Sequence, residues 1–284
     1  MTDTNPHSET APFCAGDLAE KAVFARYRDA TPIGPWNATI ASLLAHRSVR
    51  SFLPTPLAQG TLETLIAAAS SAPTSSNLQA WSVIAITDAG RRASLARIAG
   101  NQQHIIDAPL LLVWIADLSR AQRLATDAGL NLDGLDYTDT FLVASLDAVL
   151  AAQNALIAAE SLGLGTVYIG AIRNDAQAVA DILELPPNAY AVVGLVIGHP
   201  DPASPTAIKP RLPQSAILHR ERYRAEDPEV LVAHDRATAA FRAEQALPAQ
   251  NWRSLVLGRL QTTAGLSGRE RLKAALERLG FQLG

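Results

Sequence analysis

Residues 139–162 read DTFLVASLDAVLAAQNALIAAESL and contain neither glycine nor proline. When this segment is wound as a helix, apolar residues cover most of the circumference, and it has few charges, among them Asp147 and Glu160. A helix of this kind is buried on nearly all sides. We therefore expect a central core helix, or a helix packed against a second subunit, that ends at Gly163 and Gly165.

Shorter helical and strand patterns lie on both sides of this helix. Apolar residues at helical spacing predict the helices, short apolar runs predict the strands, and Gly, Pro and Asp residues separate them. The predicted helices are residues 61–71, 91–98 and 176–183, and the predicted strands are residues 81–87, 110–116, 166–169 and 191–198. Because strands and helices do not alternate in a strict repeating order, the predicted class is α+β.

The chain divides into three segments by composition. Residues 1–34 have little apolar periodicity, so we expect a mobile or loosely docked N-terminal extension. Residues 35–224 hold the patterns above and form the predicted core, with prolines between 200 and 213 that force an extended path. Residues 225–284 are more charged and mostly helical in pattern, which predicts a C-terminal helical cap.

The composition is typical of a folded globular protein, with 48% hydrophobic and 18% charged residues. The net charge of -3 and the pI near 6.1 give no electrostatic reason to expect binding to nucleic acid or an anionic membrane. The polar N-terminus does not resemble a signal peptide, and the strongest apolar runs, 110–116 and 191–198, are too short to span a bilayer. Cys14 is the single cysteine, so no internal disulfide can form. We expect a soluble, cytoplasmic protein with no nucleic-acid or membrane partner.

Several common catalytic motifs are missing from the sequence. The six histidines include no pair at metal-ligand spacing and have no cysteine partner, so we expect no metal site. Neither a G-x-S-x-G nucleophile elbow nor a G-x-x-x-x-G-K-[ST] phosphate loop occurs. Gly163-Leu164-Gly165 begins like a dinucleotide fingerprint, but it lacks the third glycine and follows a helix, which argues against a Rossmann site.

Three polar segments carry groups suited to a phosphate-bearing ligand. HRSVRSF, residues 46–52, combines two arginines, a histidine and two hydroxyls, and arginine forks suit phosphate and carbonyl oxygens. APTSSNLQAW, residues 72–81, is a polar loop between a predicted helix and a predicted strand. In KPRLP, residues 209–213, two cations share one face of an extended segment. Taken singly, the three also fit a solvated helix end, an ordinary turn and a solvated loop.

In this order, the three segments resemble the motifs of the nitroreductase superfamily, closest to its oxygen-insensitive, NADPH-using branch. The resemblance also rests on Gln102-x-His104, on QNALIAAESLGLG at residues 153–165 and on Tyr168-Ile169-Gly170. It covers roughly residues 40 to 224. It implies an α+β fold with a mixed sheet flanked by helices, in an intertwined homodimer with two identical FMN sites at the interface.

The resemblance also implies a role for each matching residue. Arg50 would lie by the N1/O2 edge of the flavin and stabilise negative charge on the reduced ring. Ala171 stands where family members often have a second glycine. The other implied FMN contacts are His46, Arg47 and Ser48 at the phosphate, ribityl chain and ring edge, Ser75, Ser76, Asn77 and Gln79 from the other subunit, Gln102 at the pyrimidine side, Tyr168, Ile169, Gly170 and Ala171 around N5 and O4, and Lys209 and Arg211 at the phosphate.

The implied reaction is a ping-pong transfer of two electrons from NADPH or NADH, through FMN, to a small electron-poor acceptor such as a nitroaromatic or a quinone. The flavin carries the chemistry, so no side-chain acid or base is obligatory. In NADPH-preferring relatives a basic loop meets the 2′-phosphate, whereas residues 241–253 here offer only Arg242 and Arg253, so we predict that NADH is also used. Two alternatives remain open: a flavin reductase that supplies reduced FMN to a partner, and a non-catalytic flavin-binding protein with a closed cap.

Overall fold

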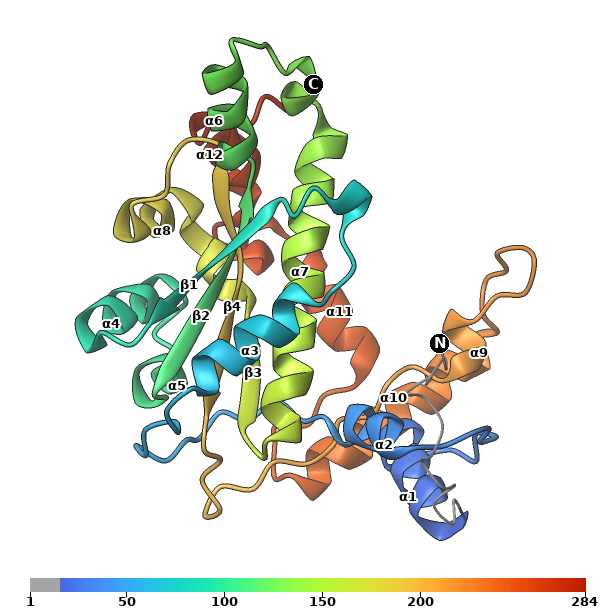
Figure 1. The fold of residues 1–284 in the computed structure, drawn as a ribbon. Helices are drawn as coiled ribbons and strands as arrows, with labels where there is room; N and C mark the ends of the chain where they lie inside the picture. The colour runs from blue at the N-terminus through green and yellow to red at the C-terminus, as the bar shows by residue number, and fades with distance from the viewer. Residues whose placement is uncertain (1–15) are drawn as a thin grey trace, which may run out of the picture. The chain divides into compact units, whose positions relative to one another are not determined.

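The computed structural model describes residues 16–284 (Figure 1). Cys14 and most of the polar N-terminal stretch lie outside the described residues. Backbone contacts group the described chain into two units, which we call unit 1 (residues 16–47 and 207–258) and unit 2 (residues 48–206 and 259–284). The described part of the predicted extension and most of the predicted cap therefore belong to unit 1, and the end of the cap belongs to unit 2.

A four-stranded sheet forms the centre of unit 2. Its strands are β1 (Trp81–Ile86), β2 (Leu110–Asp117), β3 (Gly165–Ile169) and β4 (Ala189–Gly198), in the order β1-β2-β4-β3. All four predicted strands are confirmed, but the predicted mixed sheet is not what these strands form. Strand β1 is antiparallel to β2, and β4 lies between β2 and β3 and is antiparallel to both. Every neighbouring pair is therefore antiparallel. Among residues 16–284 the only parallel pairing is the isolated bridge Ser48↔Thr166.

Both faces of the sheet are covered by helices, as Figure 1 shows. Strand β2 is buried along its whole length, and its side chains alternate between two cores. Leu112 and Trp114 pack in the core formed with α3 (Thr61–Ser70) and α7 (Thr138–Ser161). Leu111, Val113 and Ile115 pack in the opposite core, which is formed with α4 (Ala89–Ile98), α5 (Gln103–Asp107) and α8 (Ala176–Leu183).

Helix α7 is the predicted core helix, within one residue of its expected bounds. One face is a row of fully buried alanines (Ala144, Ala148, Ala151, Ala155 and Ala159) whose small side chains allow close packing against the sheet and α3. Its other face exposes large apolar side chains, Leu142, Leu146, Val149 and Leu150. By length and hydropathy alone α7 could also cross a membrane, but the core helix of a globular domain passes the same test.

Unit 1 is helical. Helix α1 (Gly16–Tyr27) lies in the segment predicted to be loosely docked, yet Ala19 and Val23 are buried. Asn37 caps the N-terminus of α2 (Ala38–Ala45) by accepting from the Ile40 backbone N–H at 2.9 Å. The remaining helices of this unit are α9 (Gln214–Ile217), α10 (Pro228–Glu244) and most of α11 (Trp252–Leu260).

The other described elements complete unit 2. Helix α12 (Leu272–Arg278) adds Ala275 and Leu276 to the core that contains α7. The prolines between 200 and 213 keep the chain free of regular structure, as predicted. Helix α6 (Ser119–Ala128) and the short 3-10 helices η1 (Ser75–Asn77), η2 (Asp133–Asp136) and η3 (Gly170–Asp175) were not predicted. The 3-10 helices η4 (Thr263–Leu266) and η5 (Arg269–Arg271) lie in the segment predicted to be mostly helical.

Candidate functional site

Two of the predicted phosphate-binding segments meet in unit 1. His46 caps the C-terminus of α2, and Arg47 follows it. The guanidinium group of Arg26 donates hydrogen bonds to the carbonyl oxygens of His46 at 2.7 Å and Lys209 at 3.1 Å. The residues Arg47, Lys209 and Arg211 are exposed. The backbone that carries these cations is thus held in place while the residues themselves face solvent.

A pocket of about 520 Å³ lies in unit 1 beside the 209–211 segment. Cations and planar or aliphatic side chains line it together, which suits a ligand that has both an anionic group and an apolar surface. One of these cations, Arg242, also donates from Nε to the Pro248 carbonyl oxygen at 2.7 Å. The lining includes Lys209, Arg211 and Arg242 on the cationic side and Tyr27, Phe241 and Trp252 among the aromatic residues.

Arg253, the second predicted contact to a 2′-phosphate, is engaged within unit 1. Its backbone N–H donates to Asp235 at 2.9 Å, and its Nε forms an ion pair with the same carboxylate. Burial of Asp235 raises the pKa of the carboxyl group, but the hydrogen bonds and charge of Arg253 outweigh burial and hold this pKa below its ordinary value. The guanidinium of Arg253 is therefore engaged in an ion pair, with its side chain about half exposed.

In unit 2, the segment Ser48–Phe52 crosses one end of the sheet. Ser48 bridges Thr166 near the start of β3, and Phe52 bridges Pro200 just beyond β4. Glycine is required at two strand positions beneath this segment. A Cβ on Gly165 would lie 2.9 Å from the Val49 side chain. A Cβ on Gly198 would likewise lie 2.9 Å from Phe52. Close packing at two glycines thus fixes the backbone on which Ser48 and Arg50 stand.

Arg50 is exposed and lies close enough to His104 to act on it electrostatically. His104 is buried at the start of α5, and its Nε2 has no hydrogen-bond partner among the described residues. Burial, and then the charge of Arg50, lower the pKa of His104 below its ordinary value of 6.5. The neighbouring Gln102 donates from its amide to the Ala99 carbonyl oxygen at 2.9 Å. The structure thus brings Arg50 near His104 of the Gln102-x-His104 motif.

The Tyr168–Ala171 stretch lies at the other end of β3. Gly170 begins the 3-10 helix η3, and a Cβ added to it would lie 3.3 Å from Nη2 of Arg173. The hydroxyl of Tyr168 donates to Gln153 at 3.3 Å. Burial, and then the charge of Glu160, raise the pKa of Tyr168, so this hydroxyl stays protonated. Strand β3 therefore has the Ser48 bridge near its start and the Gly170 backbone after its end.

Arg173 lies next to Gly170 and belongs to a cluster of three arginines that the sequence did not predict. Burial lowers the pKa of Arg269, and repulsion from Arg173 and Arg259 lowers it further. Arg269 donates to the Asn174 side chain at 3.1 Å, and Arg173 donates to the Val192 carbonyl oxygen at 2.5 Å. Within the part of the chain that the structure describes, none of the three forms an ion pair. The cluster reaches Gly170 through Arg173, and only the fold brings residues 173, 259 and 269 together.

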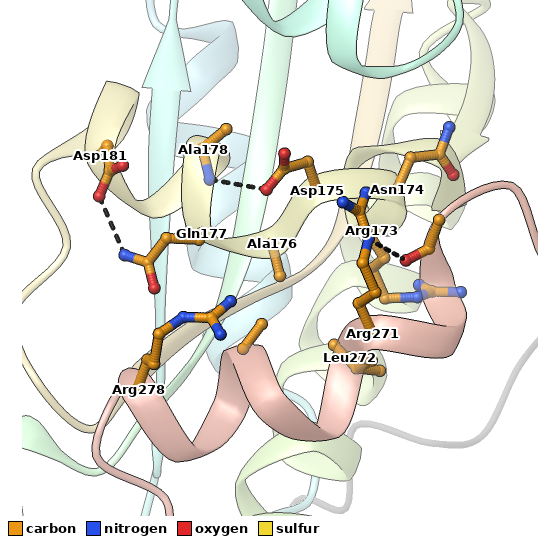
Figure 2. A pocket seen from close by; sticks show the side chains of 12 residues that line it. Arg173, Asn174, Asp175, Ala176, Gln177, Ala178, Asp181, Arg271, Leu272 and Arg278 are labelled. Carbon is orange, nitrogen blue, oxygen red and sulfur yellow. Dashed lines mark hydrogen bonds between the residues drawn. The ribbon is translucent and has the colours of Figure 1, made fainter.

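A pocket of about 320 Å³ extends from Arg173 along α8 and α12, and Figure 2 shows the side chains that line it. Arg173, Arg271 and Arg278 contribute positive charge to its wall. Two acids line it as well: Asp175 caps α8 by accepting from Ala178 at 3.0 Å, and Asp181 accepts from Gln177 at 3.0 Å. Because both signs of charge are present, the lining does not select one class of ligand.

The predicted loop Ser75–Gln79 is anchored to α7 rather than to the segments just described. The carboxylate of Asp147 accepts from the backbone N–H of Ser75 at 3.0 Å and of Ala80 at 3.4 Å. Arg120 donates to the Gln79 carbonyl oxygen at 3.0 Å. Among residues 16–284, no hydrogen bond joins this loop to Ser48, Arg50, Gln102 or Gly170. Within unit 2 the loop therefore stays separate from the other predicted contacts.

Two family models match the chain, and their matches together cover most of it. The Nitroreductase family model matches residues 43–199, and the model of the family's C-terminal domain matches residues 209–284. The chain is 42% identical over 188 residues to a Bacillus subtilis protein named FMN reductase (NADPH), covering 66% of this chain and 75% of that protein. It is 39% identical over 203 residues to the oxygen-insensitive NADPH nitroreductase of Salmonella typhimurium, covering 72% and 82%.

A solved structure agrees with these sequence matches. The hypothetical oxidoreductase YcnD from Bacillus subtilis has a TM-score of 0.82 and 35% identity, over 87% of this chain and 99% of that one. The two matched segments contain every residue for which the sequence predicted a flavin or nicotinamide contact, whereas Arg26 precedes both. Because the first family match alone spans more than half of the 284 residues, the resemblance found in the sequence is confirmed. The chain belongs to the nitroreductase family.

Proposed function

We propose that the chain is an FMN-dependent oxidoreductase that takes electrons from NADPH or NADH and delivers two of them to a small electron-poor acceptor. The observation that carries this proposal is the arrangement along β3. Ser48 bridges Thr166 near the start of this strand, on the segment that carries Arg50, and Gly170 and Ala171 follow its end. Relatives named FMN reductase and NADPH nitroreductase support the same activity.

The donor groups along these segments match the parts of FMN. Exposed Arg47, Lys209 and Arg211 supply the cations that a phosphate requires. Gly170 has no side chain, which lets a planar ring approach its backbone N–H. The other proposed contacts are His46, Ser48, Gln102, Tyr168, Ile169 and Ala171, with Ser75, Ser76, Asn77 and Gln79 contributed by a second subunit.

Bound FMN would supply the redox chemistry by accepting hydride from the nicotinamide and passing two electrons to the acceptor. The protein's task is then binding and electrostatics. The positive charge of Arg50 favours the negative charge that collects on one edge of the reduced ring. The unpartnered Nε2 of buried His104 lies within electrostatic reach of Arg50, and its lowered pKa keeps the imidazole neutral, so a second cation does not form there.

A flavin reductase that releases reduced FMN is the second candidate. It is favoured by the name of the Bacillus subtilis relative, FMN reductase (NADPH). Steady-state rates with added free FMN, compared with rates with nitrofurazone and benzoquinone at equal concentration, separate the two candidates. A higher kcat/KM for free FMN would identify the flavin reductase, whereas a higher value for the other two acceptors would identify the nitro/quinone reductase.

We also propose that the enzyme works as an intertwined homodimer. The exposed apolar side chains Leu142, Leu146, Val149 and Leu150 follow one another at helical spacing on α7 and form a surface suited to a second copy. The exposed Ser75–Gln79 loop is anchored on the same helix, so a partner packed there would receive it. A cytoplasmic location, without nucleic-acid or membrane partners, completes the proposal.

The visible absorption spectrum of the purified protein tests the proposal directly. We expect flavin bands that bleach when NADPH or NADH is added without oxygen and return when an electron-poor acceptor is added. A colourless protein that takes up no added FMN would contradict the proposal. A yellow protein that neither donor bleaches would support the flavin-binding protein without turnover, in which residues 225–284 close the site.

A further inference from the structure

Arg26 is a buried cation in helix α1, only 7% exposed, and it lies before both segments that match the family models. Burying an arginine is costly unless its donors are satisfied. All of the contacts described below lie within unit 1. They connect Arg26 to both of the phosphate-binding segments proposed above.

The first segment is the end of helix α2. Nη2 of Arg26 donates to the carbonyl oxygens of Leu44 and His46, each at 2.7 Å. Carbonyl groups at a helix C-terminus lack partners within the helix, and a cation there also interacts favourably with the helix dipole. Arg26 therefore fixes the point at which the chain leaves α2 and enters His46-Arg47.

The second segment is Lys209-Pro210-Arg211. Nη1 of Arg26 donates to the Lys209 carbonyl oxygen at 3.1 Å, and the backbone N–H of Arg211 donates to the Arg26 carbonyl oxygen at 2.8 Å. Pro210 has no N–H of its own, so these two bonds hold the residues on either side of it. Alternate residues of an extended chain share a face, so the two bonds also set the common direction of the exposed cations Lys209 and Arg211.

We propose that Arg26 is a positioning residue for the FMN phosphate. One guanidinium fork, with its donors in a fixed plane, sets the spacing between the His46-Arg47 segment and the Lys209-Arg211 segment. The inference rests on the proposed function, since it takes the phosphate of FMN as the anion that those cations hold. It assigns helix α1 to the cofactor site, although α1 lies outside the matched family segments.

A merely structural Arg26 would only dock α1, and comparison of two flavins distinguishes that role. Riboflavin has the ring and the ribityl chain of FMN but no phosphate. Dissociation constants of FMN and riboflavin are measured by fluorescence quenching with the flavin-depleted full-length chain, for wild type and for Arg26→Gln. Arg28→Gln is the matched control, because Arg28 also ties α1 to the unit through Glu244, at 3.0 and 2.8 Å, and neither of these bonds reaches a phosphate segment.

We expect Arg26→Gln to weaken FMN binding by about tenfold or more, the scale of one lost charge-assisted hydrogen bond, and to leave riboflavin binding unchanged. Arg28→Gln should change neither constant. An equal loss for both flavins, or no loss for FMN, would overturn the inference. A wild-type protein that binds neither flavin would refute the proposed function itself. Wild type that binds both flavins equally tightly would refute the phosphate clamp and, with it, the positioning role of Arg26. The proposed function would stand.

A second variant keeps the test decisive if Arg26→Gln does not fold. Arg26→Lys retains the charge but loses the planar fork, and it is combined with Lys209→Ala in a double-mutant cycle. If Arg26 acts through the Lys209 segment, Arg26→Lys weakens FMN binding much less in the Lys209→Ala background than in wild type. Fully additive losses would overturn the inference.

Discussion

Asp147, buried in the middle of the apolar helix α7, accepts a hydrogen bond from the backbone N–H of Ser75 at 3.0 Å. The same carboxylate accepts from Ala80 at 3.4 Å, so it holds both ends of the 75–80 loop. Within this loop Ser76, Asn77 and Gln79 adopt positive φ angles of 49°, 55° and 50°. Non-glycine residues in that region are strained and persist only where the surroundings hold them. A buried charge therefore compensates for a strained loop that we assign to the flavin site of a partner.

Replacement of this carboxylate tests that relationship. We expect Asp147→Ala to lower the free energy of unfolding by about 2–3 kcal/mol, because two backbone N–H groups lose a charged acceptor. Flavin binding should weaken as well, since the loop is released. Asp139→Ala, an exposed acid in the first turn of the same helix, should cost less than about 1 kcal/mol. Urea denaturation measures the free energy of unfolding of both variants, and equal losses of stability would contradict the anchoring role of Asp147.

His104 and Arg50 give a pH-dependent prediction. Burial and the charge of Arg50 lower the pKa of His104. The charge of Asp107 opposes them but is the smallest of the three effects, so the net shift is downward. The folded state therefore binds this proton less readily than the unfolded state does. Its contribution to stability is present above the ordinary pKa of 6.5 and is lost as the pH falls through 6.5 towards the lower folded value.

Arg50→Gln should raise the pKa of His104, because one of the two lowering causes is removed. An NMR titration of the imidazole, assigned with His104→Gln, measures this change. Arg47→Gln serves as the control, because it removes an exposed cation from the same motif and Arg47 is not among the groups that shift His104. A His104 titration curve unchanged by Arg50→Gln would show that the two side chains do not interact.

The ion pair between Arg253 and Asp235 predicts weak discrimination between the nicotinamide donors. With Arg253 paired to Asp235 and Nε of Arg242 bonded to Pro248, we expect kcat/KM for NADPH and for NADH to agree within about tenfold, or roughly 1.4 kcal/mol. Arg253→Ala should change their ratio only slightly, and Arg242→Ala should lower the NADPH value more. Stopped-flow reduction of the flavin measures each rate, and a strong NADPH preference that Arg253→Ala abolishes would contradict this assignment.

The exposed apolar face of α7 predicts the assembly state. Leu146→Glu places a charge in the proposed interface, so we expect monomers in sedimentation analysis and loss of bound flavin, because the partner's Ser75–Gln79 loop is withdrawn. Leu124→Glu on α6 is the control, since Leu124 is similarly exposed, at 64% against 61% for Leu146. Monomeric wild-type protein that retains its flavin would refute the shared site.

The amino-acid sequence by itself determined the elements that depend on local pattern. The absence of Gly and Pro from 139–162 and its all-round apolar surface predicted α7, and short apolar runs bounded by Gly, Pro or Asp predicted the four strands. The ordered motifs predicted the family. Periodicity indicates which face of an element is buried, and the order of the motifs indicates the family to which the chain belongs. Both can be read from neighbours along the chain.

Only the tertiary structure decided which distant residues meet. Arg26 contacts Lys209 across 183 positions, and Asp147 reaches Ser75 across 72. Neither contact can be predicted from neighbouring residues, because the local sequence around a charged helix residue does not depend on which distant backbone group it bonds. The same holds for β4, which lies between β2 and β3 and makes the predicted mixed sheet antiparallel. Strand order and charge partners follow from how the whole core packs, and so the sequence determined the elements but left their partners to the fold.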